Sequence, residues 1–173
     1  MVNMDKTDGI VLDDLDWRIL AELQDDAALT NHALAARVFC SPPTCLRRVR
    51  RLTALGVIQS VVALLDPAQV GQPLTTIVEV TLDVQTMEQL DAFERRAVAE
   101  PAVVQCYRVS GGPDFVVIVI AADMSAYHAL VARLFNAAAN VRNVRSFFSV
   151  HRAKFETRVV PPERLPGSGG TRA

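Results

Sequence analysis

Four arginines stand within five positions of the sequence: Arg47, Arg48, Arg50 and Arg51. No aspartate or glutamate lies between Cys40 and Leu65, so this positive charge has no acidic neighbour along the chain. Arginine attracts DNA phosphates and forms bidentate hydrogen bonds to guanine edges in the major groove. The group therefore indicates a DNA-binding surface, with the solvated face of an ordinary basic helix as the alternative.

The element that must position these arginines is a helix with clear signals at both ends. Ser41 is a favoured N-cap, Pro42 suits the first helical position, and Gly56 is a typical stop signal. Helical spacing places an apolar side toward a core, formed by Cys45, Leu46, Val49 and Leu52. We predict that the residues facing bases are Thr44, Arg47 and Arg51. We predict that the residues nearer to phosphates are Arg48, Arg50 and those of the helix N-terminus, Ser41 and Pro43.

The composition of the 173 residues is that of a folded chain with one large domain or two small ones, since 50% are hydrophobic and 21% are charged. The net charge of −1 provides no global attraction to nucleic acid, so binding depends on local patches such as the arginines. The N-terminus lacks a signal-peptide pattern, and no apolar run reaches the roughly 18–20 residues of a membrane span. We therefore expect a cytoplasmic protein without membrane contact.

The three cysteines, Cys40, Cys45 and Cys106, are odd in number and contain no C-x-x-C pair. Neither a disulfide framework nor a zinc finger is indicated. The favoured interpretation is that Cys40 and Cys45 are small core residues that flank the start of the arginine helix. A redox pair formed by these two thiols is the alternative.

Two helical patterns precede the arginine helix. Leu15, Ile19 and Leu23 form an apolar stripe after Asp13, and Thr30 or Asn31 caps a short second helix. Three helices, the last two joined by a few residues, predict a helix-turn-helix domain whose final helix enters the major groove. The β-like run over residues 57–65 is expected to form a wing or to pair locally, which makes the domain winged-helix-like.

The second half of the chain changes to strand and helix patterns in alternation. Strands are predicted over residues 75–82, 103–109, 115–122 and 144–150, with helices after the first and third of them. This βαββαβ order predicts a ferredoxin-like unit, with two helices on one face of an antiparallel sheet, and an α+β fold class. Because residues 115–122 are apolar on both faces, we expect a second copy to cover the open face in a homodimer.

Several motifs occur together in a fixed order. They are L-D-D-L-D-W-R-I-L-A-E-L-Q-D-D-A from Leu12, S-P-P-T-C-L-R-R-V-R-R-L from Ser41 followed by G-V-I-Q, V-S-G-G-P-D-F from Val109, and D-M-S-A-Y-H-A-L from Asp123. With them, the chain from Leu12 to about Val160 resembles the leucine-responsive regulatory protein/AsnC (feast/famine) family of prokaryotic transcription regulators. The family pattern S-P-x-x-C-x-x-R-V matches Ser41, Pro42, Cys45, Arg48 and Val49.

The resemblance implies a sequence-specific regulator that binds a double-stranded DNA operator. It also implies a homodimer formed through the sheet domain, further assembly into an octamer, and an amino-acid or related effector bound between dimers. In the family the loop before the central strand lines the effector site, which carries over onto Ser110, Gly111, Gly112 and Asp114. Strand positions that tune the ligand response in the family correspond to Ser146, Phe148 and Ser149.

Five segments are expected along the chain. They are a flexible N-terminus (1–11), a helix-turn-helix DNA-binding domain (12–62), a hinge (63–74), an effector-binding and oligomerisation domain (75–158) and a flexible tail (159–173).

A tetrapyrrole decarboxylase-like enzyme of the same two-domain fold is the alternative that the resemblance leaves open. Such enzymes use histidine and other polar residues of the sheet domain, whereas His32, His128 and His151 form no paired-histidine motif here. The sequence contains no H-E-x-x-H, G-x-S-x-G or P-loop pattern. We therefore expect no enzyme activity, no catalytic residue, no metal site and no cofactor other than the small-molecule effector.

Overall fold

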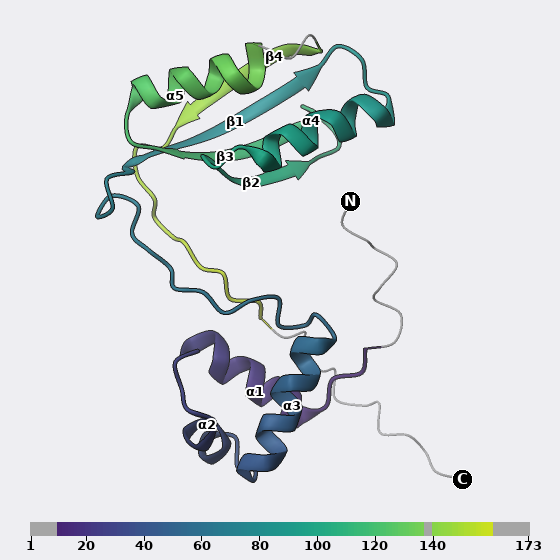
Figure 1. Ribbon diagram of the computed structural model, residues 1–173, viewed down its shortest axis with the longest axis vertical. Helices are drawn as coiled ribbons and strands as arrows, with labels where there is room; N and C mark the ends of the chain where they lie inside the picture. The colour runs from purple at the N-terminus through teal and green to yellow at the C-terminus, as the bar shows by residue number, and fades with distance from the viewer. Residues whose placement is uncertain (1–9, 137–139, 161–173) are drawn as a thin grey trace. The chain divides into compact units, whose positions relative to one another are not determined.

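The structure, a computed structural model, describes residues 10–136 and 140–160 and consists of two compact units (Figure 1). Among the described residues, the helical unit contains 10–63 and 156–160, and the sheet unit lies within Leu64–Phe155. Most of the two terminal segments predicted to be flexible, 1–11 and 159–173, lies outside the described residues.

Three helices form the helical unit: α1 (Asp14–Asp25), α2 (Asn31–Arg37) and α3 (Pro42–Ala54). The side chains of Asp13, Thr30 and Ser41 each accept a hydrogen bond from a backbone N–H in the first turn of the helix that follows. Gly56, with φ of 72°, takes the left-handed conformation of a helix stop signal directly after α3. The predicted helix-turn-helix arrangement is confirmed.

Apolar side chains from all three helices meet in one core, which contains Ile19, Leu34, Ala35, Val38, Cys45 and Leu52. Val49 packs at the edge of this core, as its position in the predicted stripe requires. The predicted burial of Leu46 is wrong, because its side chain is 39% exposed. Leu46 follows Cys45 by one residue, which turns it by about 100° away from the buried line.

Residues 57–65 are described and form no strand, so the expected wing is wrong. A β-like run forms a stable ladder only against partner strands, and the described part of the helical unit contains none. Val57 and Ile58 instead pack against the helical core, and their backbone N–H groups both donate to the carbonyl of Leu52.

The sheet unit contains the strands β1 (Leu74–Leu82), β2 (Val103–Arg108), β3 (Phe115–Ala121) and β4 (Val141–Phe148). Its helices are α4 (Met87–Ala99) and α5 (Met124–Val131), and α5 continues into a π-helical turn over Ala132–Asn136. The strands are antiparallel in the order β2-β3-β1-β4. This confirms the predicted ferredoxin-like unit, although β4 begins before the predicted residue 144 because Val141 also pairs with Leu82.

The two faces of the sheet differ sharply in exposure. On one face, Val117 of β3 belongs to a buried core shared with Phe93 of α4 and Leu130 of α5, so both helices cover the same side. On the other face, Ile77 and Phe147 pair across β1 and β4 and are 41% and 43% exposed. The open face therefore carries exposed apolar side chains, as the sequence predicted, together with the ion pair of Glu79 and Arg145 in the neighbouring cross-strand position.

The end of the described chain returns to the helical unit and contacts the last turn of α1. The side-chain amide of Gln24 accepts from the backbone N–H of Val159 at 2.6 Å and donates to the carbonyl of the same residue at 3.2 Å. Arg158 forms an ion pair with Asp25 at 2.6 Å. The first residue of the predicted flexible tail is thus held by hydrogen bonds.

Candidate functional site

The N-terminus of α3 is capped by Ser41, whose side chain bonds to Thr44 in the first turn. Ser41 Oγ accepts the backbone N–H of Thr44 at 3.4 Å and donates to Thr44 Oγ1 at 2.9 Å. Thr44 is half-buried, whereas Ser41 and Pro43 are exposed. The two hydroxyl groups therefore bond to each other within the cap, and Pro43 points outward beside them.

An ion-pair cluster of Asp13, Asp16, Arg48 and Arg51 joins the start of α1 to the middle of α3. Arg48 Nη1 lies 2.6 Å from Asp13 Oδ2 and 3.2 Å from Asp16 Oδ1, and Arg51 Nη1 lies 3.0 Å from Asp16 Oδ2. Asp16 is only 1% exposed, and a buried carboxylate is stable in its charged form only with such partners. The cluster therefore fixes the orientation of α3 against α1.

The acidic half of this cluster is also the N-terminal cap of α1. The backbone N–H of Asp16 donates to Asp13 Oδ1 at 2.9 Å, and the backbone N–H of Asp13 donates to Asp16 Oδ2 at 3.2 Å, which is a capping box. The backbone hydrogen bond from Asp16, aided by the Arg48 guanidinium, holds the pKa of the Asp13 carboxyl below its ordinary value. In the reverse direction, the bond to Asp13 raises the pKa of Arg48.

Arg47 and Arg50 lie on the other side of α3 and are exposed. Among the described residues, no carboxylate forms an ion pair with either guanidinium group. Together with Pro43 they follow one another at helical spacings of four and three residues, which places them on one stripe. The outward face of α3 is therefore centred on Pro43, Arg47 and Arg50.

The structure thus separates the four predicted arginines into two pairs. The sequence prediction grouped Arg51 with Thr44 and Arg47 on the base-facing side and placed Arg48 near phosphates. In the structure both Arg48 and Arg51 reach back to acids that lie 32 or 35 residues earlier in the chain. The aspartates at the start of α1 are evident in the sequence, but nothing local in the sequence pairs them with particular arginines.

The cysteines of the helical unit have the character of core residues. Cys45 is fully buried, and burial, with Cys40 nearby, raises the pKa of the Cys45 thiol. Because the thiolate is the reactive form, a raised pKa makes this thiol less reactive. The surroundings of Cys45 therefore favour the structural interpretation over the redox pair.

The predicted effector loop connects β2 to β3. Ser110, Gly111 and Gly112 are exposed, and Gly111 has φ of 83°. Within the described residues, the backbone N–H groups of these three residues make no hydrogen bond to the backbone. The loop therefore presents a short run of available donors.

Asp114 anchors this loop to the end of β1. Its Oδ2 accepts the backbone N–H of Leu82 at 2.7 Å and the side-chain amide of Gln85 at 3.3 Å. Its backbone N–H donates to the carbonyl of Val80 at 2.9 Å. One carboxylate oxygen of Asp114 is therefore already occupied, which the sequence did not predict.

The three predicted effector residues of β4 and its end are placed elsewhere. Ser146 is half-buried and shares a short hydrogen bond with the hydroxyl of Tyr127, and Phe148 lies edge-on to the ring of Tyr127 with the ring centroids 5.3 Å apart. Ser149 is exposed, and its backbone N–H donates to the carbonyl of Thr75 at 2.9 Å. These residues therefore surround the contact between β4 and α5.

The two sets of predicted effector residues contact different parts of β1. Phe148 is paired with Thr76 near the start of β1, whereas Asp114 bonds to Leu82 at its end. Six residues of a strand span roughly 20 Å. The sets come nearest at Ser146, which is paired with Val78, two residues from the Val80 carbonyl that accepts the Asp114 N–H.

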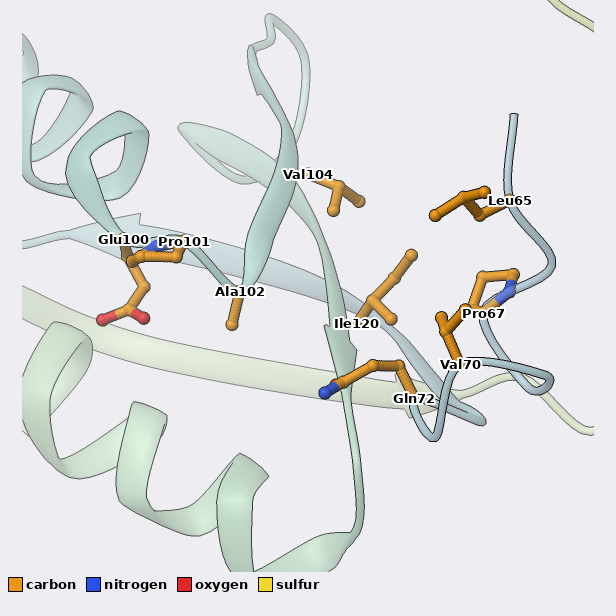
Figure 2. A pocket seen from close by; sticks show the side chains of 9 residues that line it. All are labelled: Leu65, Pro67, Val70, Gln72, Glu100, Pro101, Ala102, Val104 and Ile120. Atoms are coloured by element: carbon orange, nitrogen blue, oxygen red, sulfur yellow. The ribbon is translucent and has the colours of Figure 1, made fainter. Parts of the chain in front are cut away.

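A groove of 510 Å³ lies on the open side of the sheet, near the N-terminal end of β2 (Figure 2). Val104 and Ile120 point from the sheet toward Leu65 and Val70 of the preceding segment. No lysine or arginine is among the described residues that line it, so the carboxylate of an amino acid would meet no cation there. The groove is apolar and separate from the predicted effector residues.

Two family models cover most of the chain. A model for the AsnC-type helix-turn-helix domain matches residues 12–53, and a model for the Lrp/AsnC ligand binding domain matches residues 75–159. A leucine-responsive regulatory protein from Rhizobium meliloti is 38% identical over 145 residues, which cover 84% of this chain and 93% of that protein. The chain belongs to the Lrp/AsnC family of transcription regulators.

Solved structures of Lrp/AsnC regulators share the whole fold. An AsnC family transcriptional regulator from Agrobacterium tumefaciens has a TM-score of 0.81 and 35% identity, covering 86% of this chain and 97% of that chain. A transcriptional regulator from Neisseria meningitidis, solved as a complex with L-Met, has a TM-score of 0.81 and 29% identity, covering 87% of this chain and 97% of that chain. The resemblance stated from the sequence motifs is confirmed.

Membership of the Lrp/AsnC family decides against the decarboxylase-like alternative, because the matched relatives are transcription regulators. Within the described residues, His, Cys, Asp and Glu form no group of three or more that could hold a metal ion. In the same part of the chain, no helix is long and apolar enough to cross a membrane.

Proposed function

We propose that this regulator binds a double-stranded DNA operator through the outward face of α3, and that an amino acid or related small metabolite changes that binding. The observation that carries the proposal is the division of the arginines of α3. Arg48 and Arg51 are held by Asp13 and Asp16, whereas Arg47 and Arg50 are exposed without an acidic partner among the described residues. DNA supplies the missing partners, as phosphates or as guanine edges.

The roles of the predicted DNA-binding residues follow from this division. Arg47, in the middle of the outward face, reads a base edge, and Arg50 binds a phosphate. Ser41, Pro43 and Thr44 bring the helix N-terminus, with its partial positive charge, close to a phosphate. Arg48 and Arg51 set the angle at which α3 enters the groove and reach phosphates only with their outer edges.

Assembly through the open face of the sheet is the second part of the proposal. Ile77 and Phe147 are large apolar side chains that a soluble sheet leaves uncovered at a free-energy cost of about 25 cal/mol per Å². A second copy of the same sheet removes both from water in a homodimer. Dimers then assemble into an octamer, which brings the loop between β2 and β3 of one dimer close to the next dimer. The octamer acts in the cytoplasm, where operator DNA is found.

The effector site belongs to the loop of Ser110, Gly111, Gly112 and Asp114 at a dimer–dimer interface. The unbonded backbone N–H groups of the loop suit the carboxylate of an amino acid. Asp114 Oδ1 suits its ammonium group, since the bonds to Leu82 and Gln85 use Oδ2. The L-Met complex of the Neisseria regulator supports an amino acid as the class of ligand. Ser146, Phe148 and Ser149 adjust the response to the effector.

Selection of duplexes from a random-sequence pool by the full-length protein tests the DNA-binding proposal. We expect a preferred, nearly palindromic site whose affinity falls steeply with salt, because several arginine–phosphate contacts release counterions. Recovery of no preferred sequence at any salt concentration would refute it.

Sedimentation of Ile77→Glu tests the dimer. A charge in the centre of the open face should give monomers, whereas Val98→Glu, on the exposed surface of α4, should sediment as the wild type does. Equal masses for both variants and wild type would place the interface elsewhere.

Titration of the wild type with pooled and then single amino acids, read out as operator affinity, tests the effector. Asp114→Asn removes the charge that receives the ammonium but keeps the size of the side chain. We expect it to lose the amino-acid response while remaining a dimer. A response equal to that of wild type would move the effector site away from Asp114.

A further inference from the structure

Phe39 adopts a backbone conformation that its residue type disfavours. It has φ of 56°, the only positive value among the described non-glycine residues. Its N–H donates to the carbonyl of Ala36 at 3.3 Å, and the N–H of Cys40 donates to the carbonyl of Ala35 at 3.0 Å. This is the Schellman pattern at the end of α2, in which glycine usually occupies the position of Phe39 because it has no Cβ.

The side chain of Phe39 gains nothing within the helical unit to offset this strain. It is 86% exposed, more than any other aromatic side chain in the described part of the chain. Its neighbour Val38 is fully buried in the helical core, so the strained turn directs the valine inward and the phenylalanine outward. A single exposed apolar residue is common, but one held in a left-handed conformation in place of glycine points to a partner outside the unit.

The position of Phe39 identifies the class of that partner. The residue lies two positions before Ser41, the N-cap of α3, in the short turn that joins α2 to α3 (Figure 1). The ring therefore stands at the same end of α3 as Pro43, on the approach to the helix that carries Arg47. An apolar side chain beside a helix in the major groove meets the 5-methyl group of thymine, which is the main apolar group on a base edge there.

We infer that Phe39 is a DNA-contacting residue that packs its ring on a thymine 5-methyl group at the edge of the operator half-site. This inference rests on the proposed DNA binding by α3. It adds a sequence preference that the arginines do not supply, since arginine distinguishes guanine and phosphate but not the methyl group of thymine.

The test measures the affinity of the full-length protein for its selected duplex, made either with thymine or with deoxyuridine at every thymine position. The two duplexes pair identically and differ only in the 5-methyl groups. Wild type should bind the deoxyuridine duplex about 3- to 10-fold more weakly, as expected for loss of a buried methyl contact. Phe39→Asn should bind the thymine duplex more weakly by a similar factor and distinguish the two duplexes by less than about 2-fold.

Two variants control for folding and for simple loss of apolar surface. Asparagine accepts left-handed conformations, so Phe39→Asn should melt at or above the temperature of wild type. Phe39→Leu keeps an apolar side chain in the same conformation and should retain part of the preference for thymine.

The outcomes separate this inference from the DNA-binding proposal. The inference is overturned if deoxyuridine weakens the binding of Phe39→Asn and of wild type by the same factor. It is also overturned if Phe39→Asn changes the sedimenting mass but not the affinity for either duplex, because that result assigns the ring to a contact between copies. If wild type itself selects no duplex, the proposed DNA binding has failed first.

Discussion

The two arginine pairs of α3 carry the same charge and have opposite surroundings. Arg48 and Arg51 turn toward α1 and share the buried carboxylate of Asp16, whereas Arg47 and Arg50 turn outward and are exposed. The difference shows that a basic stretch in one helix can serve two purposes at once. The inner pair holds the helix in its orientation, and we propose that the outer pair binds DNA.

This comparison also explains how a chain with a net charge of −1 can carry a DNA-binding surface. The acids near the start of α1 neutralise the inner arginines and leave the outer ones unchanged. The positive charge of α3 that has no acidic partner among the described residues is thereby confined to its outward face.

The largest effect is expected for Asp16→Ala. The substitution leaves Arg48 and Arg51 without their shared buried partner and removes the reciprocal cap of α1, so we expect a loss of about 2–3 kcal/mol in the unfolding free energy of the helical unit. Asp16→Asn keeps an acceptor for the cap and should lose less. Denaturant unfolding followed by hydrogen exchange of the α1 and α3 amides measures both, and a change below about 0.5 kcal/mol for Asp16→Ala would break the comparison.

The outer pair should show the opposite behaviour. Arg47→Ala should weaken binding to the selected duplex by about 1–3 kcal/mol and relax the preference at one base pair. Arg50→Ala should weaken binding to all sequences alike and reduce the salt slope by about 1. Neither should change the unfolding free energy by more than about 0.5 kcal/mol. Titrations across a salt series distinguish the two roles, and a large fall in stability for either variant would assign that arginine to the fold.

An intermediate effect is expected for Arg51→Ala. Its guanidinium also donates to the carbonyl of Val11 at 3.2 Å, and its outer edge is exposed, so the loss of stability should be about 1 kcal/mol. Arg51→Lys retains one charge next to Asp16 and should lose roughly half as much. Thermal melting ranks the two, and equal melting temperatures for both variants and wild type would show that Arg51 does not hold α3.

The smallest effect concerns acid. Because the folded pKa of Asp13 is lowered by the Asp16 N–H and by Arg48, its stabilising contribution is complete above its unfolded pKa of about 3.8 and is lost as the pH falls through the lower folded value. Melting temperatures should therefore separate wild type from Asp13→Asn at neutral pH and converge as the pH falls through the lowered pKa of Asp13. Asp91, whose pKa is lowered chiefly by its bond to Arg108, is the matched control in the sheet unit. A difference in melting temperature between wild type and Asp13→Asn that is the same at all pH values would show that the charge of Asp13 does not contribute to stability.

Local signals made much of the fold predictable. Ser41, Pro42 and Gly56 set the ends of α3 through backbone chemistry that is contained in a few neighbouring residues. The alternation of apolar and polar residues in β1 and the apolar run of β3 predicted strands of a sheet, because one face of each strand must be buried. These features do not depend on the distant parts of the chain.

Most of what the sequence did not predict came from contacts between distant residues. The partners of Arg48 and Arg51 lie in α1, and the partner of Asp114 Oδ2 is the backbone of Leu82, 32 residues earlier. The missing wing has the same origin, since residues 57–65 have strand-like composition but no strand beside them. Phe39 could have been noticed as an aromatic residue at a helix end, but its left-handed conformation becomes evident only in the folded turn.

Two double variants test the central claim most directly, each measured for duplex affinity and for melting temperature. We predict that the double variant Arg47→Ala, Arg50→Ala loses about 2–4 kcal/mol of binding free energy and has the same melting temperature as wild type. We predict that Arg48→Ala with Arg51→Ala melts several degrees lower and, at temperatures where it is folded, loses much less affinity. If the first pair bound like wild type while the second lost binding without a change in melting, the outward face would not be the DNA-binding surface.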